Sequence, residues 1–263
     1  MDNLKISHYR IRGKDSAGRP REPFSLAVLA DLHNCEIGPS NRELLAAIGK
    51  HSPQAVLLAG DMLTAKFGRV HMERSLALMG ELTSRYPVFS VNGNHEERLT
   101  DEDRYGSAWE KYRSRAESIG VQILRSRGVE LRAKGMRLSL YGYEMTPEEY
   151  KHPSELTPED LERALGPAPE DSFSILLIHH PDSFAACVGW GADLTLCGHK
   201  HGGMIRLPGA GGLLGPGLQL FPRYTRGMYL ENERRMIVSA GLGSHTIPLR
   251  INNPPELVIV DIL

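Results

Sequence analysis

The chain has 263 residues, 41% of them hydrophobic, and its 31 basic and 32 acidic side chains give a formal net charge of −1. This length can bury a full core, in one α/β domain or in two small ones. The balanced charge excludes the broad basic field that holds many proteins to nucleic acid, so no stable nucleic-acid complex is expected, although a phosphate-bearing substrate is compatible with it.

The first half of the chain alternates apolar runs with amphipathic segments. The apolar runs are short, as expected of buried parallel strands, and span residues 25–30, 55–59 and 87–91. Helical periodicity occupies the segments between them, at residues 41–50 and 70–85. This alternation predicts a mainly parallel sheet with right-handed crossovers.

The second half favours short strands. We predict strands at residues 121–124, 129–132, 137–143, 173–178, 193–197, 227–230, 235–240 and 256–262. One helix is predicted at residues 104–119, and another begins at Pro158 with Thr157 as its cap. We find neither an internal repeat nor a linker, so we expect a single domain over residues 1–263 that contains two packed sheets.

Cysteine content and hydropathy indicate the compartment. Cys35, Cys187 and Cys197 are too few, and odd in number, for a disulfide framework. No apolar run approaches the ~18 residues of a membrane span, and residues 1–22 lack the apolar stretch of a signal peptide. We therefore expect a soluble, cytoplasmic protein with free thiols.

Five polar clusters each follow an apolar strand. They are Asp31-Leu32-His33, Gly60-Asp61, Gly93-Asn94-His95-Glu96, His179-His180-Pro181-Asp182 and Gly198-His199-Lys200-His201. Loops at the carboxyl ends of strands converge on one crevice in an open α/β sheet. Carboxylates, imidazoles and amide oxygens are ligands for Mn, Fe, Zn and Ni ions. Each cluster alone fits a helix cap or a turn, but five in succession indicate a metal centre.

These motifs, in this order between Asp31 and Gly203, resemble the signature of the calcineurin-like metallophosphoesterases. The tail, with Gly241-Leu242-Gly243 before Arg250, is similar to the bacterial YaeI/YkuE-like phosphodiesterase branch. The resemblance implies an α/β fold with a four-layer α/β/β/α sandwich, in which helices flank two mixed sheets. It also implies a dinuclear metal-dependent phosphoester hydrolase.

The resemblance further assigns roles by position. One metal ion would be bound by Asp31, His33 and His201, the other by Asn94, His179 and His199, with Asp61 bridging both. The ions would be two divalent or trivalent Mn, Fe, Zn or Ni ions that hold a bridging hydroxide as the nucleophile. His95 would act beside the phosphate, where it stabilises the transition state or protonates the leaving oxygen. Glu96 would either orient His95 or be a solvated turn residue.

Several assignments have alternatives. The pattern His-x-Pro-Asp selects His179, but the adjacent His180 is the competing ligand. Cys35 and Cys197 lie near the motifs, and we interpret them as small buried hydrophobic residues. The side chains that could meet substrate at the rim of the site are His245, Arg223 and Arg250.

The expected substrate class follows from two arginines that protein phosphatases of this superfamily have and this chain lacks. Protein phosphatases of this superfamily continue Gly-Asp with Asp-Arg and place an arginine before Gly-Asn-His, whereas this chain has Met62-Leu63 and Asn92 there. We therefore expect a phosphodiester or pyrophosphate, in a small molecule or a lipid-linked substrate. Some members of the branch cleave UDP-diacylglucosamine, and residues 207–220 would then form an apolar wall instead of a surface loop. A non-catalytic metal-binding scaffold is the other alternative, but such a scaffold should have lost ligands that this chain keeps.

Overall fold

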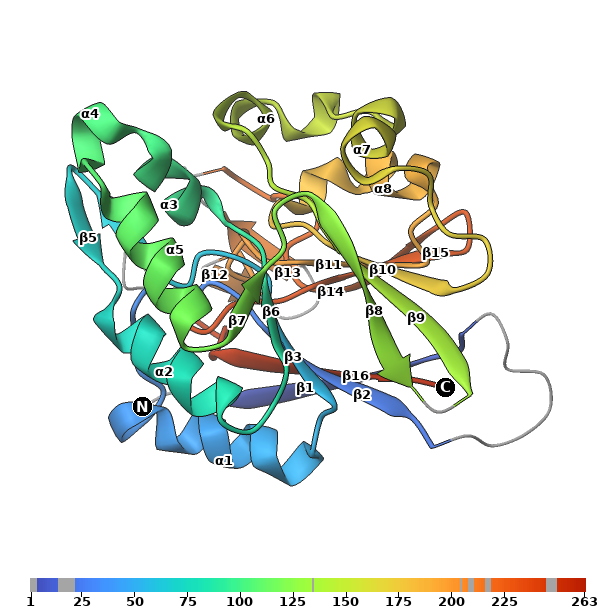
Figure 1. Ribbon diagram of the computed structural model, residues 1–263, viewed down its shortest axis with the longest axis horizontal. Helices are drawn as coiled ribbons and strands as arrows, with labels where there is room; N and C mark the ends of the chain where they lie inside the picture. The colour runs from blue at the N-terminus through green and yellow to red at the C-terminus, as the bar shows by residue number, and fades with distance from the viewer. Residues whose placement is uncertain are drawn as a thin grey trace.

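The computed structural model describes residues 4–13, 22–133, 135–203, 205–207, 211–215, 219–244 and 250–263. Two six-stranded sheets pack face to face, and helices cover the outer face of each (Figure 1). In the view of Figure 1, α1, α2 and α5 lie along one side of the molecule, and α6, α7 and α8 lie along the opposite side.

The first sheet has the strand order β1-β16-β2-β3-β6-β7. Its strands are β1 (Lys5–Ile11), β16 (Glu256–Ile262), β2 (Phe24–Leu29), β3 (Ala55–Leu58), β6 (Val88–Ser90) and β7 (Val121–Ile123). All neighbouring strands are parallel except β16 and β2, which are antiparallel. The helices of this half are α1 (Arg42–His51), α2 (Glu73–Thr83) and α5 (Ala108–Ser118).

The second sheet has the order β14-β15-β11-β10-β9-β8. Its strands are β14 (Gly227–Glu231), β15 (Arg234–Val238), β11 (Leu194–Cys197), β10 (Phe173–Leu177), β9 (Met136–Gly142) and β8 (Arg127–Ala133). The four central strands are parallel, and the two edge strands run antiparallel to their neighbours. Its helices are α6 (Pro147–Lys151), α7 (Pro158–Leu165) and α8 (Phe184–Trp190).

Three apolar layers hold these elements together. One lies between the first sheet and α1, α2 and α5, a second lies between the two sheets, and a third lies between the second sheet and α7 and α8. Alternate residues of each strand enter opposite layers, as in β2, where Leu26 and Val28 face the other sheet while Ala27 and Leu29 face the helices. The four-layer α/β/β/α sandwich is therefore confirmed.

The boundaries differ from the sequence prediction in three places. The helix expected over residues 70–85 begins only at Glu73, because residues 69–71 form β5 (Arg69–His71) of a small hairpin with β4 (Thr64–Lys66). The helix expected over residues 104–119 is split into α4 (Glu102–Tyr105) and α5 by Gly106, whose φ is 57°. Strand β1 was missed, because its exposed edge carries mostly polar side chains.

Other predictions hold closely. Thr157 caps α7 by accepting the N–H of Asp160, and β14 and β15 form the expected antiparallel hairpin. A second small hairpin joins β12 (Ile205–Leu207) to β13 (Gly211–Leu214), and a further short helix, α3 (Asn94–Glu97), follows β6. Among the described residues, no helix is both long and apolar enough to cross a membrane.

Candidate metal centre

The candidate ligands lie just beyond the carboxyl ends of five central strands. Asp31 follows β2, Asp61 follows β3, Asn94 follows β6, His179 follows β10 and His199 follows β11. Three of these strands belong to the first sheet and two to the second, so the ligands come from both sheets. The buried apolar strands end where polar ligand side chains begin, and this places the centre at one edge of the sandwich.

Backbone hydrogen bonds between the loops fix their relative positions. The N–H of Asp31 donates to the carbonyl of Gly60 at 3.0 Å, and the N–H of His33 donates to the carbonyl of Asp61 at 3.0 Å. The N–H of His199, from the second sheet, donates to both carboxylate oxygens of Asp31 at 3.0 Å. The Asp31 carboxylate therefore joins the two sheets directly.

Five candidate ligands have left-handed backbone conformations. Their φ angles are 51° at Asp31, 49° at His33, 54° at Asp61, 71° at His199 and 49° at His201. A residue with a Cβ atom pays roughly 1 kcal/mol or more for this conformation. Such strain is typical of functional sites, where surrounding structure holds a side chain in a required direction.

Close approach explains the glycines of the motifs. A Cβ atom at Gly198 would lie 2.6 Å from Oδ2 of Asp31, and one at Gly93 would collide with the Asp61 carboxylate and its backbone nitrogen. Any side chain at these two positions would displace an aspartate of the cluster. The glycines next to the ligands are therefore required by packing against Asp31 and Asp61.

The predicted ligands converge into overlapping groups. Within the described residues, ligand atoms lie within 4.8 Å of one another in three sets: Asp31 with His33 and His201, His33 with Asp61 and His95, and Asp61 with His179 and His199. Asp61 and His33 each belong to two sets. The three sets therefore form one continuous cluster of histidine and aspartate side chains that could hold metal.

Distances identify the shared atom. Oδ2 of Asp61 lies 3.8 Å from Nε2 of His33 and 3.4 Å from Nε2 of His179. Nε2 of His33 lies 3.2 Å from Nε2 of His201, and that nitrogen lies 3.7 Å from Oδ1 of Asp31. One oxygen of Asp61 therefore faces imidazoles of both proposed sites.

The two central carboxylates are buried, and no ion pair with a lysine or arginine is described for either, although the charge of Arg250 acts on Asp31. Asp31 and Asp61 are at most 1% exposed. Burial raises the pKa of Asp31 to about 7 despite the nearby imidazole of His179. Burial also acts to raise the pKa of Asp61, but the imidazoles of His179, His95 and His33 outweigh it and hold that pKa well below its ordinary value. Two buried carboxylates in this setting favour bound cations.

His179 and Asn94 provide a test of whether metal ions fit. Nδ1 of His179 lies 2.7 Å from the carbonyl oxygen of Ala59, so Nδ1 carries a proton and Nε2 is the atom left to bind a cation. Among the described residues its buried Nε2 has no hydrogen-bond partner with good geometry, and it faces carboxylate oxygens of Asp31 and Asp61 at 3.9 and 3.4 Å. The side-chain oxygen of Asn94 is likewise buried without a hydrogen bond. An imidazole nitrogen that faces two carboxylates and a buried amide oxygen both fit coordination to a cation.

Electrostatics at His179 supports the same interpretation. Burial lowers the pKa of its imidazole, but the carboxylates of Asp61 and Asp31 more than compensate and raise the pKa to about 9. In the absence of a metal ion, a proton is therefore held between the imidazole and the two carboxylates. A bound cation would replace that proton.

His180, the competing ligand, has a different role. Its Nδ1 accepts the N–H of Asp182 at 3.2 Å and caps the turn after β10. Its ring lies 4.1 Å from the ring of His199, and it belongs to none of the three ligand sets. Burial and the neighbouring charge of Lys200 lower the pKa of His180, so the ring stays neutral. The position of His180 therefore favours His179 as the ligand.

His95 is held through both its backbone and its ring. Its N–H donates to Oδ1 of Asp61 at 2.7 Å, and its Nδ1 accepts the N–H of Ala65 at 2.9 Å. A neutral ring whose Nδ1 is an acceptor carries its proton on Nε2. Burial lowers the pKa of His95, which favours this neutral form.

Glu96 has neither of the roles considered from the sequence. Its carboxylate is 1% exposed and accepts four backbone N–H groups at 2.8–3.1 Å, those of Asp61, Met62, Leu63 and Gly93. It is therefore not a solvated turn residue, and it joins two ligand loops instead of orienting His95. Sequence reasoning missed this function because all four donors are backbone groups.

We expect Glu96→Gln to destabilise the protein. The amide nitrogen of glutamine cannot accept a hydrogen bond, so at least one buried N–H would lose its partner, at a cost of about 1–3 kcal/mol. Thermal unfolding in the presence of a chelator measures this without a contribution from metal binding. Glu97→Gln is the matched control, since the Glu97 carboxylate accepts only the Thr100 hydroxyl among the described hydrogen bonds. Equal melting temperatures of the two variants would contradict this role of Glu96.

The proposed rim residues are largely engaged elsewhere. The Arg250 guanidinium donates to the carbonyls of Ala240 and Gly243, so it holds the loop that packs on Asp31 and does not face substrate. Arg223 is exposed and lies over the ring of Tyr224, whereas His245 lies outside the described residues.

The structure also describes the two cysteines near the motifs and part of the apolar segment at residues 207–220. Neither Cys35 nor Cys197 is in a described group that could hold a metal ion. Cys197 is buried as predicted, whereas Cys35 is only partly buried, so that part of the prediction is wrong. Of the apolar segment at residues 207–220, Leu220 is 67% exposed, next to Phe221 at 64%.

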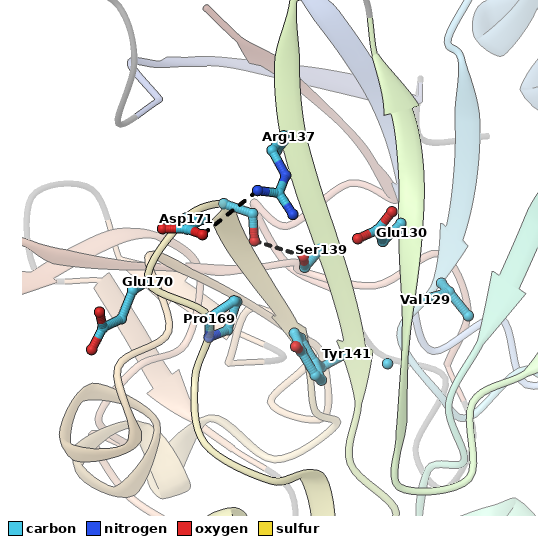
Figure 2. Close-up of a pocket in the computed structure, with 10 residues that line it drawn as sticks. Val129, Glu130, Arg137, Ser139, Tyr141, Pro169, Glu170 and Asp171 are labelled. Atoms are coloured by element: carbon cyan, nitrogen blue, oxygen red, sulfur yellow. Dashed lines mark hydrogen bonds and ion pairs between the residues drawn. The ribbon is translucent and has the colours of Figure 1, made fainter.

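A second cavity lies apart from the candidate metal ligands. This cavity of about 510 Å³ lies on the outer face of β8 and β9. A 2.6 Å hydrogen bond between Ser139 and Ser172 and an ion pair between Arg137 and Asp171 lie in its wall (Figure 2). None of its lining residues belongs to the three ligand sets. The chemistry of the chain is therefore concentrated at the edge where the five loops meet.

Comparisons with known proteins agree with this geometry. The sequence pattern of the family described as calcineurin-like phosphoesterase matches residues 24–203. The chain is 27% identical to the metallophosphoesterase YkuE of Bacillus subtilis, over 90% of this chain and 76% of that protein. It is 26% identical to the phosphodiesterase YaeI of Escherichia coli, over 98% of this chain and 87% of that protein. A solved phosphopantetheinyl hydrolase from Mycobacterium tuberculosis superimposes with a TM-score of 0.48 and 13% identity, over 81% of this chain and 88% of that one.

Proposed function

The chain belongs to the calcineurin-like phosphoesterase family and is a metal-dependent phosphoester hydrolase, and we propose that it is a phosphodiesterase that uses two metal ions. The match covers all five ligand motifs, and the cluster of histidines and aspartates supplies the divalent-metal ligands that such an enzyme needs. We infer the number of ions and the type of ester from the geometry of the site.

The position of Asp61 carries the two-metal proposal. In this proposal Asp31, His33 and His201 bind one ion, Asn94, His179 and His199 bind the other, and Asp61 touches both. Support comes from Oδ2 of Asp61, which faces Nε2 of His33 and Nε2 of His179 at 3.8 and 3.4 Å. The other carboxylate oxygen is held by the N–H of His95 at 2.7 Å, so the orientation of Asp61 is fixed.

The residues divide the chemistry between them. The two ions, when bound, supply the positive charge that holds the phosphate and makes a bound water acidic enough to attack it. His95, with its proton on Nε2, donates a hydrogen bond to the phosphate or a proton to the leaving oxygen. Glu96 keeps the loops of Asp61 and Asn94 in register through its four N–H contacts.

The surroundings of the centre support a diester as substrate. A monoester dianion needs more positive charge than a diester monoanion, and protein phosphatases provide it with arginines that this chain lacks. Lys200, which lies between two ligands in the sequence, is 4% exposed and paired with Asp182 at 2.8 Å. Arg250 is committed to backbone carbonyls. Neither side chain provides a clamp over the reacting phosphate.

We therefore expect bis-p-nitrophenyl phosphate to be cleaved with a higher kcat/KM than p-nitrophenyl phosphate when Mn²⁺ is added. The difference should be about tenfold or more, because a charge-assisted hydrogen bond that is missing for the dianion is worth ~1.5–3 kcal/mol. Steady-state kinetics on the two substrates with one enzyme preparation measures the ratio, with chelator-treated protein as the blank. A preference for the monoester would contradict the phosphodiesterase proposal and leave the metal ligands unaffected.

A further inference from the structure

A cavity of about 680 Å³ opens beside the metal centre, and the proposed reaction does not yet account for it. Asn94 and His199, both candidate ligands, are part of its wall. Its other lining residues come from the segment after β6 and from α6: Glu97, Arg98, Thr100, Asp101, Arg104, Tyr105, Pro147, Tyr150 and Lys151. Only two candidate ligands line it, so the cavity extends to one side of the centre.

Helical spacing directs one arginine from the metal centre into this cavity. Asn94 and Arg98 are four residues apart, and the backbone from α3 into the following turn is helical at Arg98, with φ −54° and ψ −27°. Residues at this spacing lie on the same face of a helix. Arg98 and Asn94 both line the cavity, so the arginine lies on the same wall as a candidate ligand.

Arg98 and Arg104 differ from neighbouring arginines in that no ion pair with a carboxylate is described for them. Arg113 pairs with Glu110 and Glu117, Arg115 with Glu73, and Arg125 with Glu144. Within the part of the chain that the structure describes, Arg98 contacts only the Ala65 carbonyl at 3.4 Å, and Arg104 only the ring of Tyr105 at 5.8 Å. The third cation of the cavity, Lys151, pairs with Glu148 at 2.8 Å.

The carboxylates of the cavity are used locally. Asp101 caps α4 by accepting the N–H of Arg104, and Glu97 accepts the hydroxyl of Thr100. Neither forms an ion pair with the two arginines among the described contacts. The charge of Arg98 acts on the Glu97 carboxylate, but no described ion pair occupies the donors of either guanidinium, which are therefore suited to an anionic group of a ligand.

We propose that Arg98 and Arg104 bind a second anionic group, a carboxylate or a phosphate, on a substituent of the phosphoester substrate. This inference rests on the proposed function, since the metal centre must hold the reacting phosphate. The substrate class is then a phosphoester with a second negative charge next to the scissile phosphate. A guanidinium presents its N–H donors in a planar fork that fits either a carboxylate or a phosphate. The cavity would therefore prefer ligands that carry a second anionic group within reach of the two arginines.

Binding of two phosphonates to the metal-loaded protein tests the inference. Propylphosphonate and 3-phosphonopropionate are not hydrolysed by phosphoesterases because their phosphorus is bonded to carbon, and they differ by a terminal carboxylate. We expect wild-type protein to bind 3-phosphonopropionate about tenfold more tightly in isothermal titration calorimetry, as expected for a charge-assisted contact. In the double variant Arg98→Ala/Arg104→Ala, the affinity ratio should fall to about one. The matched control is Arg113→Ala, whose arginine lies on α5 and outside the cavity, and it should keep the wild-type ratio.

The outcomes separate this inference from the proposed function. If both phosphonates bind wild-type protein equally, or if the double variant keeps the preference, the arginines do not select a second anion and the inference is wrong. The phosphoesterase proposal survives either result, because phosphonate binding at the metals is intact. If neither phosphonate binds metal-loaded protein, the proposed function fails and the inference fails with it.

Discussion

His95→Ala is expected to lower kcat for bis-p-nitrophenyl phosphate by about 10²–10⁴-fold, the usual contribution of a positioned acid, while metal content stays close to the wild-type value. The reason lies in the ring contacts. Nδ1 is occupied by the N–H of Ala65, and the backbone N–H that holds Asp61 is kept by alanine. The substitution therefore removes the proton on Nε2 without removing the support of Asp61.

The competing interpretation is that His95 is itself a metal ligand, since its ring lies in one of the three ligand sets with His33 and Asp61. Metal analysis of the purified variant, next to steady-state kinetics, distinguishes the two. His152→Ala is the matched control, because that histidine is exposed and lies outside the three sets. A variant that loses metal as completely as one lacking Asp61 would make His95 a ligand.

Asp61→Ala is expected to abolish both metal binding and hydrolysis. The Asp61 carboxylate faces imidazoles of both proposed sites, so its removal takes a ligand from each ion. It also removes the acceptor of the His95 N–H, which would move the catalytic imidazole. Activity should fall to the level of chelator-treated enzyme, a loss of at least about 10⁴-fold if both ions leave the site.

The control for this variant is Asp171→Ala, which removes an exposed carboxylate from the remote cavity of Figure 2. It should retain wild-type metal content and activity. Thermal unfolding with chelator confirms that Asp61→Ala still folds. If folded Asp61→Ala retained one tightly bound ion and substantial activity, Asp61 would not be a shared ligand.

Much of the fold could be predicted from the chain, because buried strands leave a strong local pattern. The runs that became β2, β3 and β10 are apolar except for Ser25 and Ser174, and they end two residues before a ligand motif. Strand β1 leaves no such pattern. It is stabilised by pairing with β16, at the other end of the chain, and its outer edge is polar. A pairing over that sequence distance cannot be seen in local periodicity.

The candidate site divides in the same way. Its ligand types could be predicted, because each stands directly after a strand and the loops of one sheet edge must converge. The supporting contacts could not. Glu96 accepts hydrogen bonds from the backbone N–H groups of three residues far away in the sequence, and Arg250 donates to backbone carbonyls. Backbone partners of this kind leave no pattern in the amino-acid sequence. That no ion pair is described for Arg98 or Arg104 could not be predicted either, because it depends on how the neighbouring helices pack.

Anomalous X-ray diffraction from crystals of Mn²⁺-loaded wild-type protein tests the central claim most directly. The account predicts two anomalous peaks per chain about 3.5–4 Å apart, the separation usual in two-metal sites, with a carboxylate oxygen of Asp61 in contact with both. One peak should lie among Asp31, His33 and His201, and the other among Asn94, His179 and His199. A single fully occupied peak, or a second peak that does not contact Asp61, would contradict the two-metal phosphodiesterase.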